Sequence, residues 1–376
     1  MARQPRRARP LSSERKLIDL GLQGGGAHGA FTWGVLDRLL ADDGIEIDGI
    51  SGTSAGAMNA VVLADGLARG GREGARERLA LFWKRVSDAA RFSPVQRTPL
   101  DQLLGRWTLD FSPGFLALDL MTRLVSPYEF NPFDFNPLRE IVAEVVDFDR
   151  VHACEAVQIF VTATHVPTGR PRTFAGPEIT LDAVMASACL PFLFHAVEID
   201  GEPYWDGGFM GNPVLHPLVE RTDARDLVVV QINPLVRPGT PKTARDILNR
   251  VNEISFNSAL LNGIRTILLL KELAGEAGFA DERLSHLMLH RIHAEEEMAE
   301  LGVSSKMNAE WAFLQHLHDV GWRAADRFLA DHRDDLGVRS TYPLEHVLWG
   351  VDRVMRAAAE AACSGEEETD VRTDAS

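Results

Sequence analysis

Residues 46–63 read EIDGISGTSAGAMNAVVL and contain the pattern that decides the fold. Residues 46–50 alternate polar and apolar positions like a β-strand, and residues 57–63 are typical of a buried helix. Between them, Gly52-Thr53-Ser54-Ala55-Gly56 matches G-x-S-x-G, a sharp strand-to-helix turn that exposes a serine hydroxyl. Gly52 and Gly56 are needed there because a side chain would collide with the strand or helix that passes close by. The pattern therefore predicts that Ser54 attacks a carbonyl carbon.

A glycine-rich stretch precedes this turn in the sequence. It reads Gly24-Gly25-Gly26-Ala27-His28-Gly29 and lies between a strand expected over residues 17–22 and an amphipathic helix expected over residues 30–40. In such a run several backbone N–H groups can point at one spot, with the positive end of a helix behind them. We therefore expect residues 24–29 to form an oxyanion hole, with Gly25, Gly26 and Ala27 as the main donors.

A carboxylate follows a third expected strand, over residues 196–205. Asp206 is followed there by Gly207 and Gly208, so no bulky neighbour crowds its side chain. A carboxylate at the end of a strand can accept the proton of a serine hydroxyl. Asp206 is thus the candidate general base for Ser54.

Together the three motifs resemble the patatin-like phospholipases, lipid acyl hydrolases that use a serine–aspartate dyad. Residues 186–192, ASACLPF, are similar to the Ala-Ser…Pro stretch that precedes the aspartate in that family. The resemblance covers roughly residues 15–235, and it departs from the family at His28, where Arg or Lys is usual. It implies an acyl-enzyme formed on Ser54, Asp206 as its partner, lipid or other ester substrates, a role in lipid degradation, and no metal or organic cofactor.

The order of expected elements predicts an α/β fold. Strand signals alternate with helical stretches, which indicates a three-layer α/β/α sandwich around a mainly parallel sheet, with a helical C-terminal extension. Ligands of such sheets bind at the carboxyl ends of the strands, where all three motifs would meet. The strands are expected over residues 17–22, 46–50, 156–166, 196–205 and 227–232.

Composition shifts divide the chain into four parts. We expect a disordered basic N-terminus over residues 1–14 and a patatin-like catalytic domain over residues 15–240. A mostly helical region over residues 241–362 would pack on that domain, and residues 363–376 would form a disordered acidic tail. The catalytic domain carries an insertion at about residues 88–147, rich in Pro and aromatics. Those aromatics form either a subsidiary core or a cap that makes an acyl-chain pocket or touches lipid.

The charge balance bears on possible partners. With 39 Lys and Arg against 54 Asp and Glu, the formal net charge is −15, which disfavours nucleic acid and anionic lipid heads as partners. A membrane would have to be contacted locally and transiently.

The three cysteines have no ligand-like spacing, and the N-terminus lacks the apolar stretch of a secretory signal. These features favour a cytoplasmic protein with peripheral membrane contact allowed, and they do not indicate an oligomeric state.

Four alternatives remain open at this point. Gly24, Gly26 and Gly29 also match G-x-G-x-x-G, with Asp48 near the position of a ribose-binding acid, as in an NAD(P)-dependent oxidoreductase. The protein could be a catalytically weak, patatin-like binding protein. The first three of the late histidines could be metal ligands on one helix face, or the serine could belong to a Ser-Asp-His triad. The late histidines are His286, His290, His293, His316 and His318.

Overall fold

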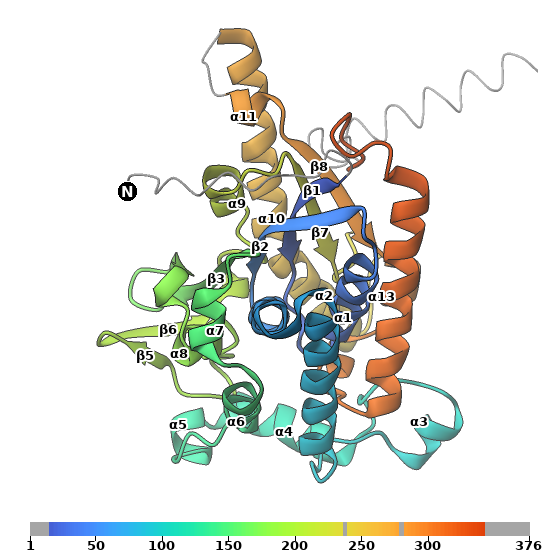
Figure 1. The fold of residues 1–376 in the computed structure, drawn as a ribbon. Coiled ribbons are helices and arrows are strands. Elements are labelled where there is room, and N and C mark those ends of the chain that lie inside the picture. Colours follow the sequence, from blue (N-terminus) through green and yellow to red (C-terminus); the bar gives the residue numbers. More distant parts are fainter. Residues whose placement is uncertain (1–14, 236–238, 278–281, 343–376) are drawn as a thin grey trace, which may run out of the picture.

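The computed structural model describes residues 15–235, 239–277 and 282–342 (Figure 1). The segments 1–14 and 363–376, expected to be disordered, lie outside the described residues, as does the end of the expected helical region. The division of the chain into domains remains a prediction.

Eight strands of the described chain form one sheet in the order β5-β6-β3-β2-β1-β7-β8, with β4 paired to β3. The pairs β1–β2, β1–β7, β2–β3 and β7–β8 are parallel, and the pairs of β3 with β4, β3 with β6 and β5 with β6 are antiparallel. The strands are β1 Lys16–Leu22, β2 Ile45–Gly52, β3 Gln158–His165, β4 Arg170–Ala175, β5 Val197–Ile199, β6 Glu202–Asp206, β7 Asp226–Gln231 and β8 Met288–His293.

Helices cover both faces of this sheet, as the sandwich prediction requires. Along β7, Val228 and Val230 pack into the core beneath α1, α2 and α13, whereas Leu227 and Val229 pack with α9 and α10. A strand buried on both faces needs apolar residues at every position, which explains the run Leu227-Val228-Val229-Val230. The predicted three-layer α/β/α fold with a mainly parallel sheet is therefore confirmed.

The helices range from single turns to elements of more than thirty residues. The longest, α2, has non-helical backbone at Gly70 and Gly71. The α-helices are α1 Gly29–Leu40, α2 Ala55–Ala90, α3 Pro99–Leu103, α4 Pro113–Leu124, α5 Pro127–Phe130, α6 Pro137–Val145, α7 Phe148–Ala153, α8 Leu181–Ser187, α9 His216–Arg221, α10 Ala244–Ala277, α11 Glu282–Ser285, α12 Glu295–Ala299 and α13 Trp311–His332. The short 3₁₀ helices are η1 Gly26–His28, η2 Gly176–Glu178, η3 Gly207–Phe209 and η4 Val303–Met307.

The C-terminal region packs closely on the rest of the fold. Helix α13 runs beside α1 in Figure 1. A Cβ added at Gly34 would lie 1.9 Å from the His318 carbonyl oxygen, and one at Gly321 would lie 2.0 Å from the Phe31 oxygen. These two glycines let the backbones of the helices touch. The same region also contributes β8, which extends the central sheet beyond β7.

The single strand expected over residues 196–205 is wrong, because this segment is a hairpin. Strands β5 and β6 are joined by Asp200 and Gly201, whose φ angles are 57° and 79°. Two successive residues with positive φ are typical of the tight turns that connect antiparallel strands, and Asp-Gly is a favoured pair for them.

Pairing along β3 explains how Asp206 reaches the same place as Ser54. Strand β4 occupies one edge of β3, so β2 and β6 share the other edge. Strand β2 runs up to Gly52, opposite Val161, and β6 runs in the opposite direction down to Asp206, opposite Ala163. The carboxyl ends of β2 and β6 therefore face each other. The ends of the two strands meet as expected, although β6 runs antiparallel to β2 along the same edge of β3.

The aromatic insertion consists of short helices. Helices α3, α4, α5 and α6 each begin with proline directly after a capping residue, and these residues are Thr98, Ser112, Ser126 and Asn136. The prediction of a subsidiary core is wrong for much of this segment, since Phe92 and Phe133 are about nine-tenths exposed. Other exposed aromatic residues of the segment are Phe111, Tyr128 and Phe135. Elements of one to three turns have too little surface to enclose so many large side chains.

Candidate active site

Ser54 stands at the turn between β2 and α2. Its backbone has φ 55° and ψ −123°, a strained conformation that non-glycine residues rarely adopt. It occupies the N-cap position of α2, but its side chain makes no capping hydrogen bond. A serine that served only as a cap would bond to the first helical amides. The hydroxyl is thus directed away from its own helix.

Close backbone contacts explain the glycines on either side of Ser54. A Cβ at Gly52 would lie 2.6 Å from the Gly56 carbonyl oxygen, and one at Gly56 would lie 2.3 Å from the Leu22 carbonyl oxygen. Both distances are shorter than any real carbon contact, and the neighbouring atoms are backbone atoms that cannot rotate away. The turn can form only with glycine at these two positions.

The turn is also held from outside by Ser187, a residue to which the sequence analysis assigned no role. The Ser54 amide donates a hydrogen bond to the Ser187 hydroxyl oxygen at 2.9 Å, and that hydroxyl donates to the Thr162 carbonyl at 2.6 Å. Ser187 is the last residue of α8, in the Ala-Ser…Pro stretch that resembled the family. Its contact with Ser54 gives that stretch a physical role.

Asp206 is buried at the end of β6, with its side chain directed to the same point as the Ser54 hydroxyl. Burial raises the pKa of Asp206 from 3.8 to about 6, while hydrogen bonds from the Gly208 amide and the Ser54 hydroxyl and the charge of Lys306 oppose that rise. The Gly208 amide donates to Oδ1 at 2.7 Å. Because a carboxylate with a pKa near 6 is a stronger base than an exposed one, burial improves its ability to take a proton from serine.

The glycine loop lies beside both residues. Three of its amides already have partners. The Gly24 N–H donates to Asn212 Oδ1 at 2.6 Å, the His28 N–H donates to the Gly25 oxygen at 3.2 Å, and the Gly29 N–H donates to the Gly26 oxygen. The N–H groups of Gly25, Gly26 and Ala27 have no acceptor among the described residues, and these three residues line the cavity that contains Ser54. Gly26 has φ 58° and would place a Cβ 2.5 Å from the Lys306 carbonyl oxygen, so glycine is required there.

A buried polar network fixes the base of this loop. Gln23 accepts hydrogen bonds from the Ile232 and Asn233 amides, and its own amide donates to Asn257 Oδ1 at 3.1 Å. Asn212, which holds Gly24, also accepts from Gln23 through its carbonyl oxygen. The network joins β1, the end of β7 and α10, so the position of the loop depends on all three elements.

The cavity over Ser54 and Asp206 has a volume of about 450 Å³. Helix α4 contributes Phe115 and Leu118 to its wall, so part of the insertion does cover the site. Other apolar wall residues come from α2, α6, α10, η4 and the segment after α8. They are Met58, Phe82, Trp83, Val86, Leu138, Leu190, Phe192, Leu193, Phe194, Phe256 and Met307. Such a wall favours an apolar chain over a polar or charged group.

The late histidines have other partners. His290 is fully buried, with Nε2 2.9 Å from Asp226 Oδ1 and Nδ1 2.9 Å from the Thr341 hydroxyl. His318 lies 2.9 Å from Asp37, and His316 stacks on Trp107. The lining of the cavity, taken over the described residues, includes none of the five late histidines. In the same part of the chain, no group of three His, Cys, Asp or Glu side chains is arranged to hold a metal ion.

Asp48, the residue that would bind the ribose in a dinucleotide site, has another role in the structure. Asp48 is buried and accepts a hydrogen bond from the Ala224 amide at 3.2 Å, in the loop that leads into β7. The carboxylate therefore fastens one loop of the sheet. The Lys306 backbone lies against one side of the glycine loop, at Gly26.

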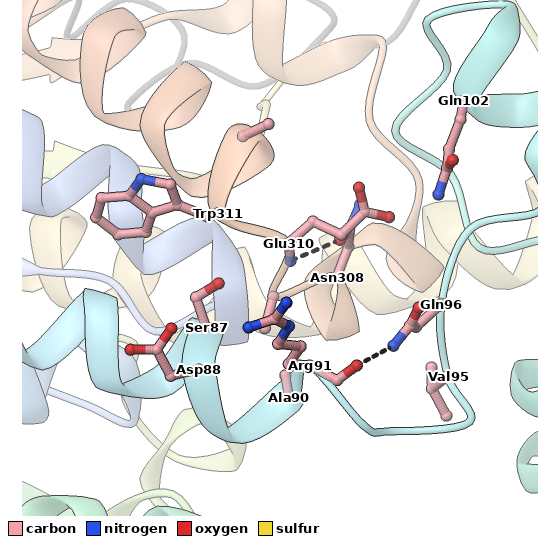
Figure 2. A pocket seen from close by; sticks show the side chains of 12 residues that line it. Ser87, Asp88, Ala90, Arg91, Val95, Gln96, Gln102, Asn308, Glu310 and Trp311 are labelled. Carbon is pink, nitrogen blue, oxygen red and sulfur yellow. Dashed lines mark hydrogen bonds between the residues drawn. The ribbon is translucent and has the colours of Figure 1, made fainter.

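A second cavity, of about 400 Å³, lies between the end of α2 and the start of α13 (Figure 2). Its polar groups bond to one another: the Glu310 amide donates to Asn308 Oδ1 at 3.0 Å, and the Gln96 side chain donates to the Arg91 carbonyl at 2.6 Å. Neither Ser54 nor Asp206 lines it. This cavity is separate from the site described above.

Hydropathy of the helices bears on membrane contact. Among the helices of the described residues, none combines the length and the apolar character that crossing a bilayer requires.

The chain is similar to the solved structure of VipD from Legionella pneumophila, with 13% identity and a TM-score of 0.37, over 96% of this chain and 78% of that one. It is also similar to the type III effector protein ExoU, with 14% identity and a TM-score of 0.24, over 96% of this chain and 67% of that one. A search of curated proteins found no match. The family model described as patatin-like phospholipase matches residues 20–219, more than half of the 376 residues. The chain belongs to the patatin-like phospholipase family.

Proposed function

We propose that this protein is a serine acyl hydrolase that cleaves lipid esters through a Ser54–Asp206 dyad. One observation carries the proposal: the Ser54 hydroxyl and the buried Asp206 carboxylate interact at the floor of an apolar cavity, beside amides that have no acceptor among the described residues. These are the three groups that acyl transfer needs, namely a nucleophile, a base and donors for the oxyanion.

The reaction begins when Asp206 takes the proton of the Ser54 hydroxyl. The Ser54 oxygen attacks the ester carbonyl carbon, and the N–H groups of Gly25, Gly26 and Ala27 stabilise the oxyanion that develops. Asp206 then donates its proton to the departing alcohol, which leaves an acyl group on Ser54. A water molecule loses a proton to Asp206, attacks the acyl carbon and releases the fatty acid, and Ser54 regains its proton from Asp206.

The substrate class follows from the wall of the cavity. Each methylene group that leaves water contributes about 0.8 kcal/mol, so longer acyl chains should bind better until the cavity is filled. Phe115 and Leu118 of α4 line the cavity, while Leu116 and Leu120 of the same helix are exposed. This arrangement supports a fatty acyl ester as substrate and allows the insertion to contact a lipid surface.

A chain-length series tests the proposal. Hydrolysis of p-nitrophenyl esters from acetate to palmitate, and of phosphatidylcholine vesicles, is compared for the wild type, Ser54→Ala and Asp206→Asn. We expect kcat/KM to rise with chain length and to fall by at least about a hundredfold in either variant. Ser54→Ala with wild-type turnover would exclude the proposed nucleophile, and a wild type inactive on every ester would favour a binding-only relative.

A further inference from the structure

The oxyanion loop lacks the positive charge that is usual in the family, because His28 stands where Arg or Lys is expected. His28 is buried, and its Nε2 lies 2.8 Å from the Ser305 hydroxyl. Burial lowers the pKa of His28 well below 6.5, and the nearby charge of Lys306 lowers it further. The imidazole is therefore neutral at physiological pH, and it serves to anchor η4 against the loop.

Lys306 of η4 brings a cation to the same place from a distant part of the chain. Its carbonyl oxygen lies against Gly26, and the residue lines the cavity together with Ser54 and Asp206. Its charge lowers the pKa of Asp206. Over the described residues, Lys306 is the only basic side chain in that lining. It lies well beyond residues 20–219, so the family match does not include it.

The ammonium group of Lys306 is held in a defined position. Nζ donates hydrogen bonds to Asn233 Oδ1 at 3.0 Å and to Asn252 Oδ1 at 3.1 Å. It also lies 5.3 Å from the centre of the Phe256 ring, which packs against Gly208 beside Asp206. Both asparagine oxygens are neutral acceptors that orient the ammonium group. A fixed charge in an apolar, partly enclosed site acts more strongly than one in water.

We propose that Lys306 supplies the positive charge that stabilises the oxyanion at Ser54, in place of the basic residue usual at position 28. The segment that follows the family-matched region thereby completes the active site. This inference rests on the proposed acyl hydrolase function. Lys306 is a positioning residue that acts through space on the reacting oxygen and on Asp206, whereas the loop amides contact the oxyanion directly.

The test removes the positive charge of Lys306 while keeping a hydrogen-bond donor at that position. Lys306→Gln retains an N–H group for the asparagines, and Lys306→Arg retains the charge. Arg339→Gln is the matched control, because it removes one positive charge from an exposed side chain beyond the far end of α13, a helix of 22 residues or about 33 Å. Each protein is assayed with p-nitrophenyl butyrate, which carries no anionic group, from pH 5 to 9, with thermal denaturation beside it.

We expect Lys306→Gln to lower kcat by about ten- to a hundredfold with KM changed less than about twofold. Lys306→Arg should keep kcat within about threefold of wild type, and Arg339→Gln should match wild type. The acid limb of the pH profile should move to higher pH in Lys306→Gln, because Lys306 lowers the pKa of Asp206. A residue with only a structural role would not move that limb.

Three results would overturn the inference. One is an unchanged kcat in Lys306→Gln. Another is a rise in KM with kcat unchanged, which would make Lys306 a substrate-binding residue. The third is an equal loss in Lys306→Gln and Lys306→Arg with lower thermal stability and an unmoved acid limb. Lys306→Met is the second neutral variant should Lys306→Gln fail to fold. Failure of the proposed function is distinct, since the wild type would then leave the ester intact and Ser54 unlabelled by a fluorophosphonate, and the inference would fail with it.

Discussion

Replacing Asp206 with asparagine should abolish turnover and stabilise the fold at neutral and alkaline pH. Burial raises the pKa of Asp206 from 3.8 to about 6, against the opposing contributions of Gly208, Ser54 and Lys306. At about 1.4 kcal/mol per pKa unit, the difference between these values corresponds to about 3 kcal/mol that the ionised carboxylate costs the folded state. Asparagine has nearly the same shape and no charge, so it avoids this cost.

The sign of the pH dependence follows from linkage. Because the pKa is higher in the folded than in the unfolded chain, the Asp206 carboxyl group favours folding below pH 3.8 and loses this contribution as the pH rises through about 6. The stability advantage of Asp206→Asn over wild type should therefore approach about 3 kcal/mol at pH 8 and vanish at about pH 3.5. In the wild type, kcat/KM should fall about tenfold per pH unit below about pH 6, as the base becomes protonated.

Urea unfolding at the two pH values measures this difference, with p-nitrophenyl butyrate hydrolysis measured on the same samples. Asp331→Asn is the matched control, since Asp331 is exposed on α13 and the change should alter stability by less than about 0.5 kcal/mol. Asp206→Asn that is less stable than wild type at pH 8, or equally shifted at both pH values, would refute the burial argument. Wild-type turnover by Asp206→Asn would remove the base assignment.

Three further predictions concern packing, the histidines and the cavity. Gly52→Ala should destabilise the fold by about 1–3 kcal/mol or more in urea unfolding, because its Cβ would lie 2.6 Å from the Gly56 oxygen. The control is Gly263→Ala in α10, where an added Cβ would have no atom within 4 Å, and it should be neutral or stabilising. His290→Ala should cost about 1–3 kcal/mol, because Asp226 Oδ1 loses its hydrogen bond to Nε2 while it keeps the one from the Gly337 amide. The variant should keep kcat per folded molecule, and a folded but inactive variant would favour a triad. Leu118→Trp on the cavity face of α4 should lower kcat/KM for palmitoyl but not for acetyl esters. The control Leu120→Trp, on the exposed face of the same helix, should change kcat/KM for neither ester. Equal effects of the two variants would contradict the assigned cavity.

Local sequence patterns predict much of the fold and the proposed catalytic groups. The strands β1, β2 and β7 and the turn at Ser54 are predictable because glycine positions and apolar runs report steric demands that neighbours in the sequence create. The β5–β6 hairpin was also signalled, by Asp200-Gly201, but one long strand is the simpler interpretation of the apolar positions around it. The short helices of the insertion had a signal too, in the repeated pairing of a capping residue with proline.

Residues that act across long sequence separations could not be predicted in this way. Ser187 holds the Ser54 amide from 133 residues away, and Asn212 holds Gly24 from 188 residues away. Lys306 reaches Asn233 across 73 residues. Asn212 and Lys306 stand in no local pattern that distinguishes them from ordinary polar residues, and the Ala-Ser…Pro stretch marks Ser187 without showing what it contacts. Their roles arise only when the sheet brings distant loops to one edge.

Covalent capture measures whether Ser54 is a nucleophile that Asp206 activates. Wild type, Ser54→Ala and Asp206→Asn are treated with a fluorophosphonate at pH 8, and the labelled site is mapped by peptide mass spectrometry. We expect one phosphonyl group on Ser54 of the wild type, none on Ser54→Ala, and labelling at least about a hundredfold slower in Asp206→Asn. Labelling at another residue, or an equal rate in Asp206→Asn and wild type, would contradict this expectation.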